Sequence, residues 1–139
     1  MIIWILSILF PLQTTSQDKL TYDIYYRGKD VGDYEITRTR NGGIVEYDSH
    51  SVTKVQFLAT LEVRVSQEVR YENGVLVSSI ATTRVNGDQH DKVVSRKVGN
   101  RYEVDNDGKV YGIGDEIHFS VVKLMFKEPK DLGRVFSEI

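Results

Sequence analysis

The chain has 139 residues, of which 40% are hydrophobic and 27% charged, and its formal net charge at pH 7 is −2. This length suits one globular domain, and the balanced charge offers neither the basic patch of a nucleic-acid-binding protein nor a polybasic membrane anchor. Cysteine is absent, which excludes disulfides, zinc sites of the cysteine type and a lipid-modified cysteine. We therefore expect no nucleic-acid partner and no cofactor.

The first sixteen residues, MIIWILSILFPLQTTS, carry no charged side chain. Residues 2–10 form an apolar run that is too short to span a bilayer but has the length of a signal-peptide hydrophobic region. Pro11 would end that helix, and we expect cleavage after Ser16. The predicted organisation is a signal peptide over residues 1–16 and a single β domain over residues 17–139, with no transmembrane span after cleavage. The predicted location is the periplasm or cell envelope, with secretion as the alternative. For the leader itself, the alternatives to a signal peptide are an apolar N-terminal strand or a retained anchor.

Turn sequences divide the rest of the chain into strand-like segments. Asn-Gly and Asp-Gly pairs favour the positive φ angles of tight hairpin turns, and strand-like runs between regular turns are typical of an antiparallel meander. This pattern predicts seven to nine strands. The turn sequences lie at residues 41–43, 73–74, 86–87, 99–100 and 107–108, and the expected strands at 20–27, 32–40, 44–52, 61–72, 75–85, 92–98, 101–104 and 109–111.

Residues 61–72, LEVRVSQEVRYE, show the strand pattern most clearly. Apolar and polar side chains alternate along the whole segment, which places one apolar face and one solvated face on the same strand. Gln67 is the polar exception on the apolar face. We expect it to be hydrogen-bonded near a strand irregularity, with a position facing a cavity as the alternative. The candidate residues for contact with an apolar ligand are Leu61, Val63, Val65, Val69 and Tyr71.

One short helix is predicted near residues 120–128. Ser120 can cap it, because a serine hydroxyl accepts a hydrogen bond from a first-turn amide. Val121, Leu124 and Met125 have helical spacing, and the proline that follows prevents continuation. The predicted fold is therefore mainly β, an antiparallel meander curled into a half-barrel or small open barrel, with the helix plugging one end.

The histidines do not indicate a metal site or a catalytic triad. They lie far apart in the sequence, and none has the spacing of a metal-binding motif. Asp48 and His50 would share one face of a strand while Ser49 points the other way, and no G-x-S-x-G elbow accompanies them. We therefore expect no catalytic and no metal-binding residue. The three histidines are His50, His90 and His118.

The sequence DNDG at residues 105–108 has two interpretations. Counted as the start of a calcium loop, it places Glu116 at the final ligand position. Val110, however, stands where such a loop requires glycine, and no amphipathic helices flank the segment. We therefore interpret residues 105–108 as a hairpin turn.

Three segments of the chain resemble one family of exported bacterial envelope proteins. They are TYDIYYRGKDVGDYEITR, with Gly28 and Gly32 around a turn, YENGVLVSS, and IHFSVVKLMFKEPKDLGRVFSE. The chain is similar to this family, DUF6134, over roughly residues 20–139. The resemblance implies a curled antiparallel sheet and supplies no catalytic residue. Because family members usually continue with further strands beyond the position of Ile139, it also implies a chain truncated at its C-terminus.

Three functions fit these features. The first is a non-catalytic envelope protein that holds a lipid or another apolar small molecule against the curled sheet. The second is an interaction or assembly module that binds an envelope protein through an exposed strand edge. The third is an enzyme acting on envelope glycans, which would require clustered carboxylates or a histidine of perturbed pKa. The alternating strand and the predicted plug helix favour the first function, and a small outer-membrane barrel is disfavoured by the charged face of that strand.

Overall fold

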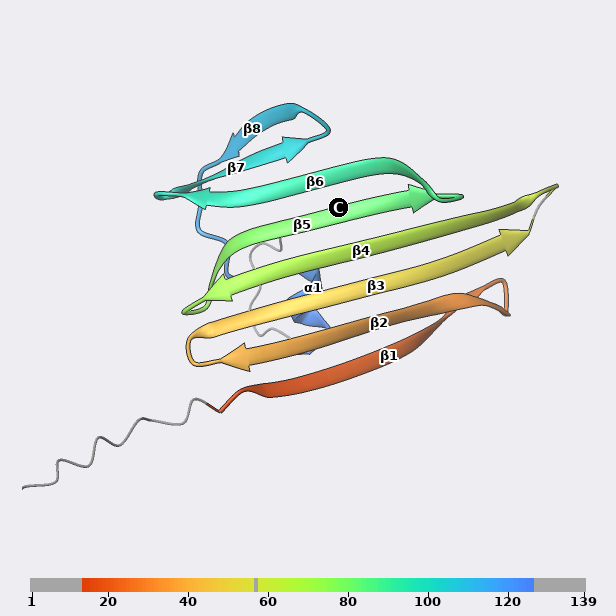
Figure 1. Cartoon of the computed structure of the whole chain (residues 1–139), viewed down its shortest axis with the longest axis horizontal. Helices are drawn as coiled ribbons and strands as arrows, with labels where there is room; N and C mark the ends of the chain where they lie inside the picture. Colours follow the sequence, from red (N-terminus) through yellow and green to blue (C-terminus); the bar gives the residue numbers. More distant parts are fainter. Residues whose placement is uncertain (1–13, 57, 127–139) are drawn as a thin grey trace, which may run out of the picture.

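The computed structural model describes residues 14–56 and 58–126, which form an eight-stranded antiparallel sheet and one short helix (Figure 1). Each strand pairs with the next in the chain, and β1 and β8 lie at opposite edges, so the meander is open. The predicted mainly β meander with one short helix is confirmed. The elements are β1 (Ser16–Tyr26), β2 (Lys29–Asn41), β3 (Ile44–Gln56), β4 (Thr60–Glu72), β5 (Val75–Val85), β6 (Asp88–Val98), β7 (Arg101–Asn106), β8 (Lys109–Ile113) and α1 (Val121–Leu124).

Two predicted features fall largely outside the described residues. Most of the predicted signal peptide does so, and Ser16, its last residue, is the first residue of β1. The end of the predicted helix and the C-terminal part of the family-like segment lie in residues 127–139. Both remain predictions from the sequence.

Tight turns join the strands, as the Asn-Gly and Asp-Gly pairs predict. The pairs Asn73–Gly74, Asn86–Gly87 and Asp107–Gly108 each place two successive residues at positive φ, the conformation that matches the twist of a two-residue hairpin. The carboxylate of Asp105 accepts a hydrogen bond from the amide of Gly108 at 2.8 Å. Residues 105–108 are therefore the β7–β8 hairpin, which confirms that interpretation.

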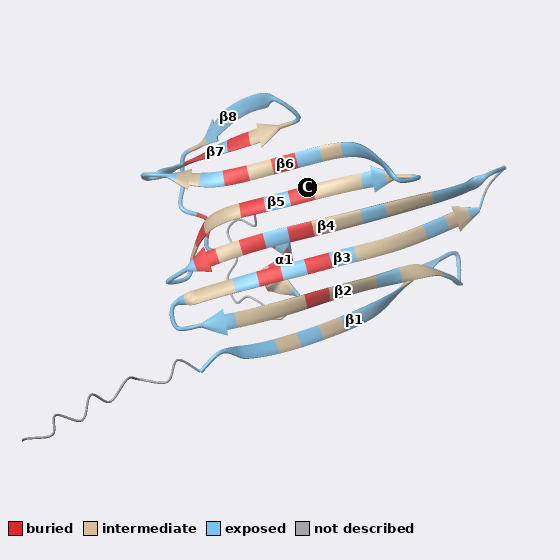
Figure 2. Cartoon of the chain, viewed as in Figure 1, coloured by how far each residue is buried: buried red, intermediate tan, exposed pale blue. Residues whose placement is uncertain are grey.

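The sheet has two unlike faces. The inner face is the one on which α1 lies (Figure 1), and on β3 and β4 it carries apolar side chains, serine, threonine and one glutamine. All charged side chains of these two strands point to the outer face. Figure 2 shows that buried positions gather in the part of the sheet next to the β2–β3 and β4–β5 turns. The core consists of Ile36, Tyr47, Val69, Tyr71, Leu76, Tyr102, Ile117 and Val122.

The helix packs mainly through Val122, and of the residues with helical spacing only Leu124 is half-buried. Val122 is fully buried, whereas Val121 and Met125 are 36% and 41% exposed. Ser120 makes no side-chain cap, and its hydroxyl instead bonds to the hydroxyl of Tyr71 at 2.7 Å. Ser120 therefore occupies the predicted N-cap position, but the predicted capping hydrogen bond of its hydroxyl is not formed. The reason is that α1 has little more than one turn, so contacts with the sheet decide which side chains point inward.

Several contacts attach the segment before α1 to the sheet, and the buried hydroxyl of Tyr102 makes one of them. Tyr102 on β7 donates a hydrogen bond to the carbonyl oxygen of Leu76 at 2.8 Å and accepts one from the amide of Ile117 at 3.1 Å. The amide of Leu76 in turn donates to the carbonyl oxygen of Ile117 at 2.8 Å. This bonding fixes the position from which the chain enters α1.

Gly32 has a positive φ of 156°, which directs a side chain at this position toward the neighbouring strand. It pairs with Ile24 of β1 beside a register shift and with Thr53 of β3. A Cβ atom at this position would collide with the backbone carbonyl of Val52. Glycine is therefore required here by the positive φ and by the neighbouring carbonyl of Val52.

Replacing Gly32 with alanine is expected to lower the free energy of unfolding by more than about 1 kcal/mol, because β2 or β3 must move to admit the methyl group. Gly114→Ala is the matched control, since no described atom lies within 4 Å of a Cβ there. Urea denaturation followed by circular dichroism measures both effects. Similar unfolding midpoints for the two variants would contradict the collision with the carbonyl of Val52.

Replacing Tyr102 with phenylalanine is expected to cost about 1–3 kcal/mol, because the buried amide of Ile117 and carbonyl of Leu76 lose a hydrogen-bond partner. Tyr111→Phe on the neighbouring strand is the control, because that side chain is 51% exposed and surface substitutions usually change stability by less than about 0.5 kcal/mol. The same denaturation measurement applies. A Tyr102→Phe variant as stable as the control would refute the proposed bonding.

Candidate functional site on the inner face of the sheet

The inner face has a covered half and an open half. The covered half contains the core residues on which α1 and the segment before it pack. The open half lies toward the β3–β4 connection, where side chains on the same face are half-buried or exposed. Leu61 at the start of β4 is 37% exposed. The open half consists of Tyr22, Tyr34, Ser51, Thr53, Val55, Leu61, Val63, Val65, Thr83 and Val85.

The five candidate ligand-facing residues all lie on the inner face, as the alternating pattern predicts, but they divide between the two halves. Val69 and Tyr71 are 2% and 1% exposed and belong to the packed core. Leu61, Val63 and Val65 continue along the same strand into the open half. The surface that an apolar ligand could reach is therefore limited to the last three.

Four buried polar side chains interrupt the apolar inner face, and they are Ser49, Gln67, Ser79 and Ser95. Ser49 donates a hydrogen bond to Oε1 of Gln67 at 3.2 Å, so the predicted hydrogen bond of Gln67 is confirmed. The pairing of β3 with β4 is regular at Gln67, and the irregularity on this strand is a register shift toward β5 between Arg70 and Tyr71. Among the described residues, Nε2 of Gln67 and Oγ of Ser95 have no hydrogen-bond partner. Such unpaired polar groups lower the stability of the fold when they are buried, so these positions stabilise the core less than apolar side chains would.

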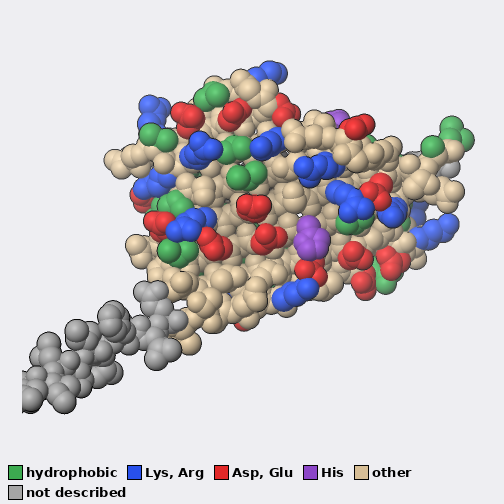
Figure 3. Space-filling model, viewed as in Figure 1, with side chains coloured by type: hydrophobic (Ala, Val, Ile, Leu, Met, Phe, Trp, Pro, Cys, Tyr) green, Lys and Arg blue, Asp and Glu red, His purple; other side chains and the backbone are tan. Residues whose placement is uncertain are grey.

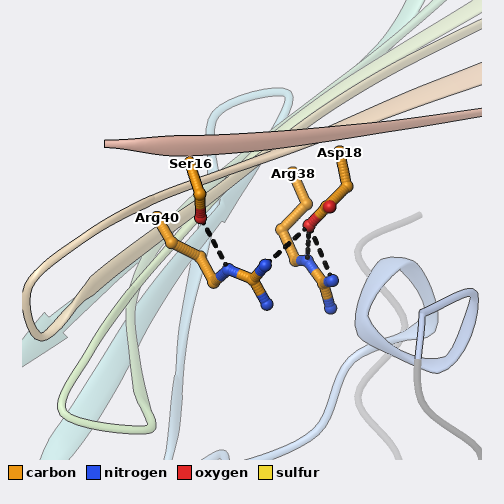
Figure 4. Close-up of polar contacts among 4 residues, drawn as sticks. All are labelled: Ser16, Asp18, Arg38 and Arg40. Carbon is orange, nitrogen blue, oxygen red and sulfur yellow. Dashed lines mark hydrogen bonds and ion pairs between the residues drawn. The ribbon is translucent and has the colours of Figure 1, made fainter. Parts of the chain in front are cut away.

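Two arginines on β2 share one carboxylate on β1 (Figure 4). Oδ2 of Asp18 accepts hydrogen bonds from Nε and Nη2 of Arg38 at 3.1 and 2.8 Å and from Nη2 of Arg40 at 2.9 Å. Nε of Arg40 also donates to the hydroxyl of Ser16 at 3.1 Å. The hydrogen bonds from Arg38 hold the pKa of Asp18 below its ordinary value. The group therefore keeps one positive charge in excess.

The spacing of Arg38 and Arg40 in the sequence indicates that the two arginines lie together. Arg38 and Arg40 are separated by one residue on a strand, so period-two alternation places both side chains on one face. The guanidinium group of Arg38 lies 4.4 Å from the ring centre of Phe126, which assigns that face to the inner side. The partner of both arginines, Asp18, is twenty or more residues away in the chain and could not be identified from a local pattern.

The outer face is a charged surface with a shallow hollow of about 560 Å³. Figure 3 shows side chains of both signs spread across it. Asp48 and Glu68 lie opposite each other in register in this hollow. Asp48 and His50 share the outer face while Ser49 is buried on the inner one, as predicted. Because the sheet separates Ser49 from His50, these residues cannot form a catalytic triad.

A second outer hollow, of about 350 Å³, lies beside the β7–β8 hairpin. It contains Asp107, whose pKa is raised above its ordinary value chiefly by a hydrogen bond with Asp91. The same carboxyl group accepts a hydrogen bond from the amide of Lys92 at 3.2 Å and thereby ties the hairpin to β6. Within residues 14–56 and 58–126, no three side chains of histidine, cysteine, aspartate or glutamate are arranged to hold a metal ion.

Comparison with known proteins identifies the family. A profile described as Domain of unknown function (DUF6134) matches residues 22–139, a range that includes the C-terminal part of β1 and every later element. No curated protein and no solved structure is detectably similar to the chain. None of the helical structure in the described residues is long and apolar enough to cross a membrane. Because the match extends over far more than half of its length, the chain belongs to the DUF6134 family.

Proposed function

We propose that this protein is an exported, non-catalytic envelope protein that binds a lipid or another apolar small molecule on the open half of its inner face. The observation that carries the proposal is the change in exposure along β4. Tyr71 and Val69 are almost fully buried, Val65 and Val63 are half-buried, and Leu61 is 37% exposed. All five side chains are apolar or aromatic and point to the same face.

The composition of the open half supports a binding surface. Exposed apolar surface costs about 25 cal/mol per Å², and a bound apolar molecule recovers that free energy. Small-molecule sites are typically apolar with a few polar groups that orient the ligand. Ser51, Thr53 and Thr83 supply such hydroxyl groups beside the valines.

Export is supported by the N-terminal sequence and by the family resemblance. The uncharged leader, with its apolar run at residues 2–10, has the length of a signal-peptide core. The resemblance to exported envelope proteins points to the same compartment. An apolar ligand in that compartment has an obvious source in membrane lipid.

A second candidate function is binding of a partner protein through the free edge of β1. This edge strand is eleven residues long, and an exposed edge can receive a strand from another chain. Its charged residues Asp18, Lys19 and Asp23 and its register shift at Ile24/Tyr25 are devices that discourage edge pairing. The opposite edge, β8, has only five residues. We therefore place edge binding second.

The test is native mass spectrometry of the full chain purified from an exporting host. We expect the mass of a chain that lacks residues 1–16, carrying one co-purified apolar ligand. Val65→Glu should lower ligand occupancy at least about tenfold, because a carboxylate in the apolar site must be desolvated. Ser66→Glu is the matched control, since it adds the same charge on the outer face of the same strand.

Each outcome discriminates between the candidates. A ligand retained by the wild type and by Ser66→Glu but lost by Val65→Glu supports the proposal. Ligand-free wild-type protein in a stoichiometric complex with another protein favours the edge-binding alternative. Equal ligand occupancy in the two variants places the ligand elsewhere and contradicts the assigned surface.

A further inference from the structure

We infer that the ligand is an anionic amphiphile with a single acyl chain, the class to which fatty acids belong, and that its head group binds Arg38 and Arg40. This inference rests on the proposed function. Where β2, β3, β4 and β5 pair with one another, the inner-face positions carry only these two charged residues. On this part of the inner face an anion is therefore attracted to one place.

The arginine pair retains hydrogen-bonding capacity after its structural contacts are made. An arginine has five N–H donors in a planar fork that fits the two oxygens of a carboxylate or phosphate. Asp18 accepts three hydrogen bonds from the pair, and Ser16 accepts one. The side chain of Arg40 is 44% exposed. Arg40 is therefore an accessible cation that still has N–H donors available and shares one carboxylate, that of Asp18, with Arg38.

Other cations on the inner side are differently placed. Lys97 on β6 has its own carboxylate, Glu116, at 3.2 Å. Lys123 on α1 donates a hydrogen bond to the carbonyl oxygen of His118 at 2.7 Å and lies 4.6 Å from the ring centre of Tyr71. The arginine pair differs from both lysines, because Arg38 and Arg40 lie side by side on one strand and share a single carboxylate (Figure 4).

An apolar path connects the arginine pair to the open half. Leu20 on β1 lies opposite the buried Ile36 and is half-buried, and Tyr22 comes next on the same face at 42% exposure. The rings of Tyr22 and Tyr34 lie 6.2 Å apart and form the near border of the open half. From Arg38 to Tyr34 the strand rises about 13 Å, which an acyl chain can follow. Head and tail sites thus lie along one β1–β2 edge.

The experiment compares dodecanoate with dodecanol, which has the same chain length and no charge. Binding to the delipidated full chain is measured by displacement of a fluorescent apolar probe at neutral pH, with acetate as the head group alone. Ionic hydrogen bonds to the arginines should make dodecanoate bind about tenfold more tightly than dodecanol. Acetate alone should not displace the probe, because the tail contributes most of the binding surface.

Three variants assign the effect to the arginine pair. Arg40→Gln should reduce the preference for dodecanoate to less than about threefold, and Arg38→Lys, which keeps the charge but loses the fork, should reduce it partly. Arg84→Gln removes the same charge from the outer face of β5 and should leave the preference unchanged. Circular dichroism verifies that each variant is folded.

The outcomes separate this inference from the proposed function. If dodecanoate and dodecanol bind equally, the apolar site stands and the arginine pair serves only to attach β1 to the sheet. If acetate competes as well as dodecanoate, the arginines bind anions without a tail, and the amphiphile is refuted. If neither amphiphile binds, the proposed function fails as well. An unchanged preference in Arg40→Gln also overturns the assignment.

Discussion

The hydroxyl of Tyr102 joins β7 to the carbonyl of Leu76 at the start of β5 and to the amide of Ile117 in the segment before α1. This contact determines where the chain crosses the inner face. From that point Ser120 reaches the hydroxyl of Tyr71, and Val122 enters the core. The same contact therefore fixes which half of an otherwise continuous apolar face is covered and which half stays open.

The division of the inner face has an energetic consequence. Packing on the covered half buries large side chains that an open sheet cannot bury by itself, and this burial supplies the hydrophobic contribution to folding. The open half carries the same types of side chain, but it does not gain the free energy of burial because α1 does not pack on it. Such a surface is unfavourable in a free protein and favourable once a ligand is bound. The charged outer face, by contrast, keeps the opposite side of the sheet in contact with water.

Local patterns predicted the parts of the molecule that local chemistry controls. The turn pairs and the alternation in residues 61–72 fixed the hairpins and the face on which Val65 lies, because both depend on neighbouring residues alone. The exposure of Val65 and the burial of Val69 depend on contacts with a segment some fifty residues away. Ser120 is the N-cap residue as predicted, but its hydroxyl does not cap the helix, because it bonds to Tyr71 instead. The arginine pair was visible as alternating residues, but its shared carboxylate was not.

The most direct test of the division between the halves is a nuclear Overhauser experiment on the protein with methyl-labelled valine, leucine and isoleucine and an unlabelled apolar ligand. The account predicts contacts from the ligand to the methyl groups of Val63 and Val65 in the open half. It predicts none to Ile80 and Val94, which are paired on the outer face. Contacts to Ile80 and Val94 with none to the open half would contradict the account.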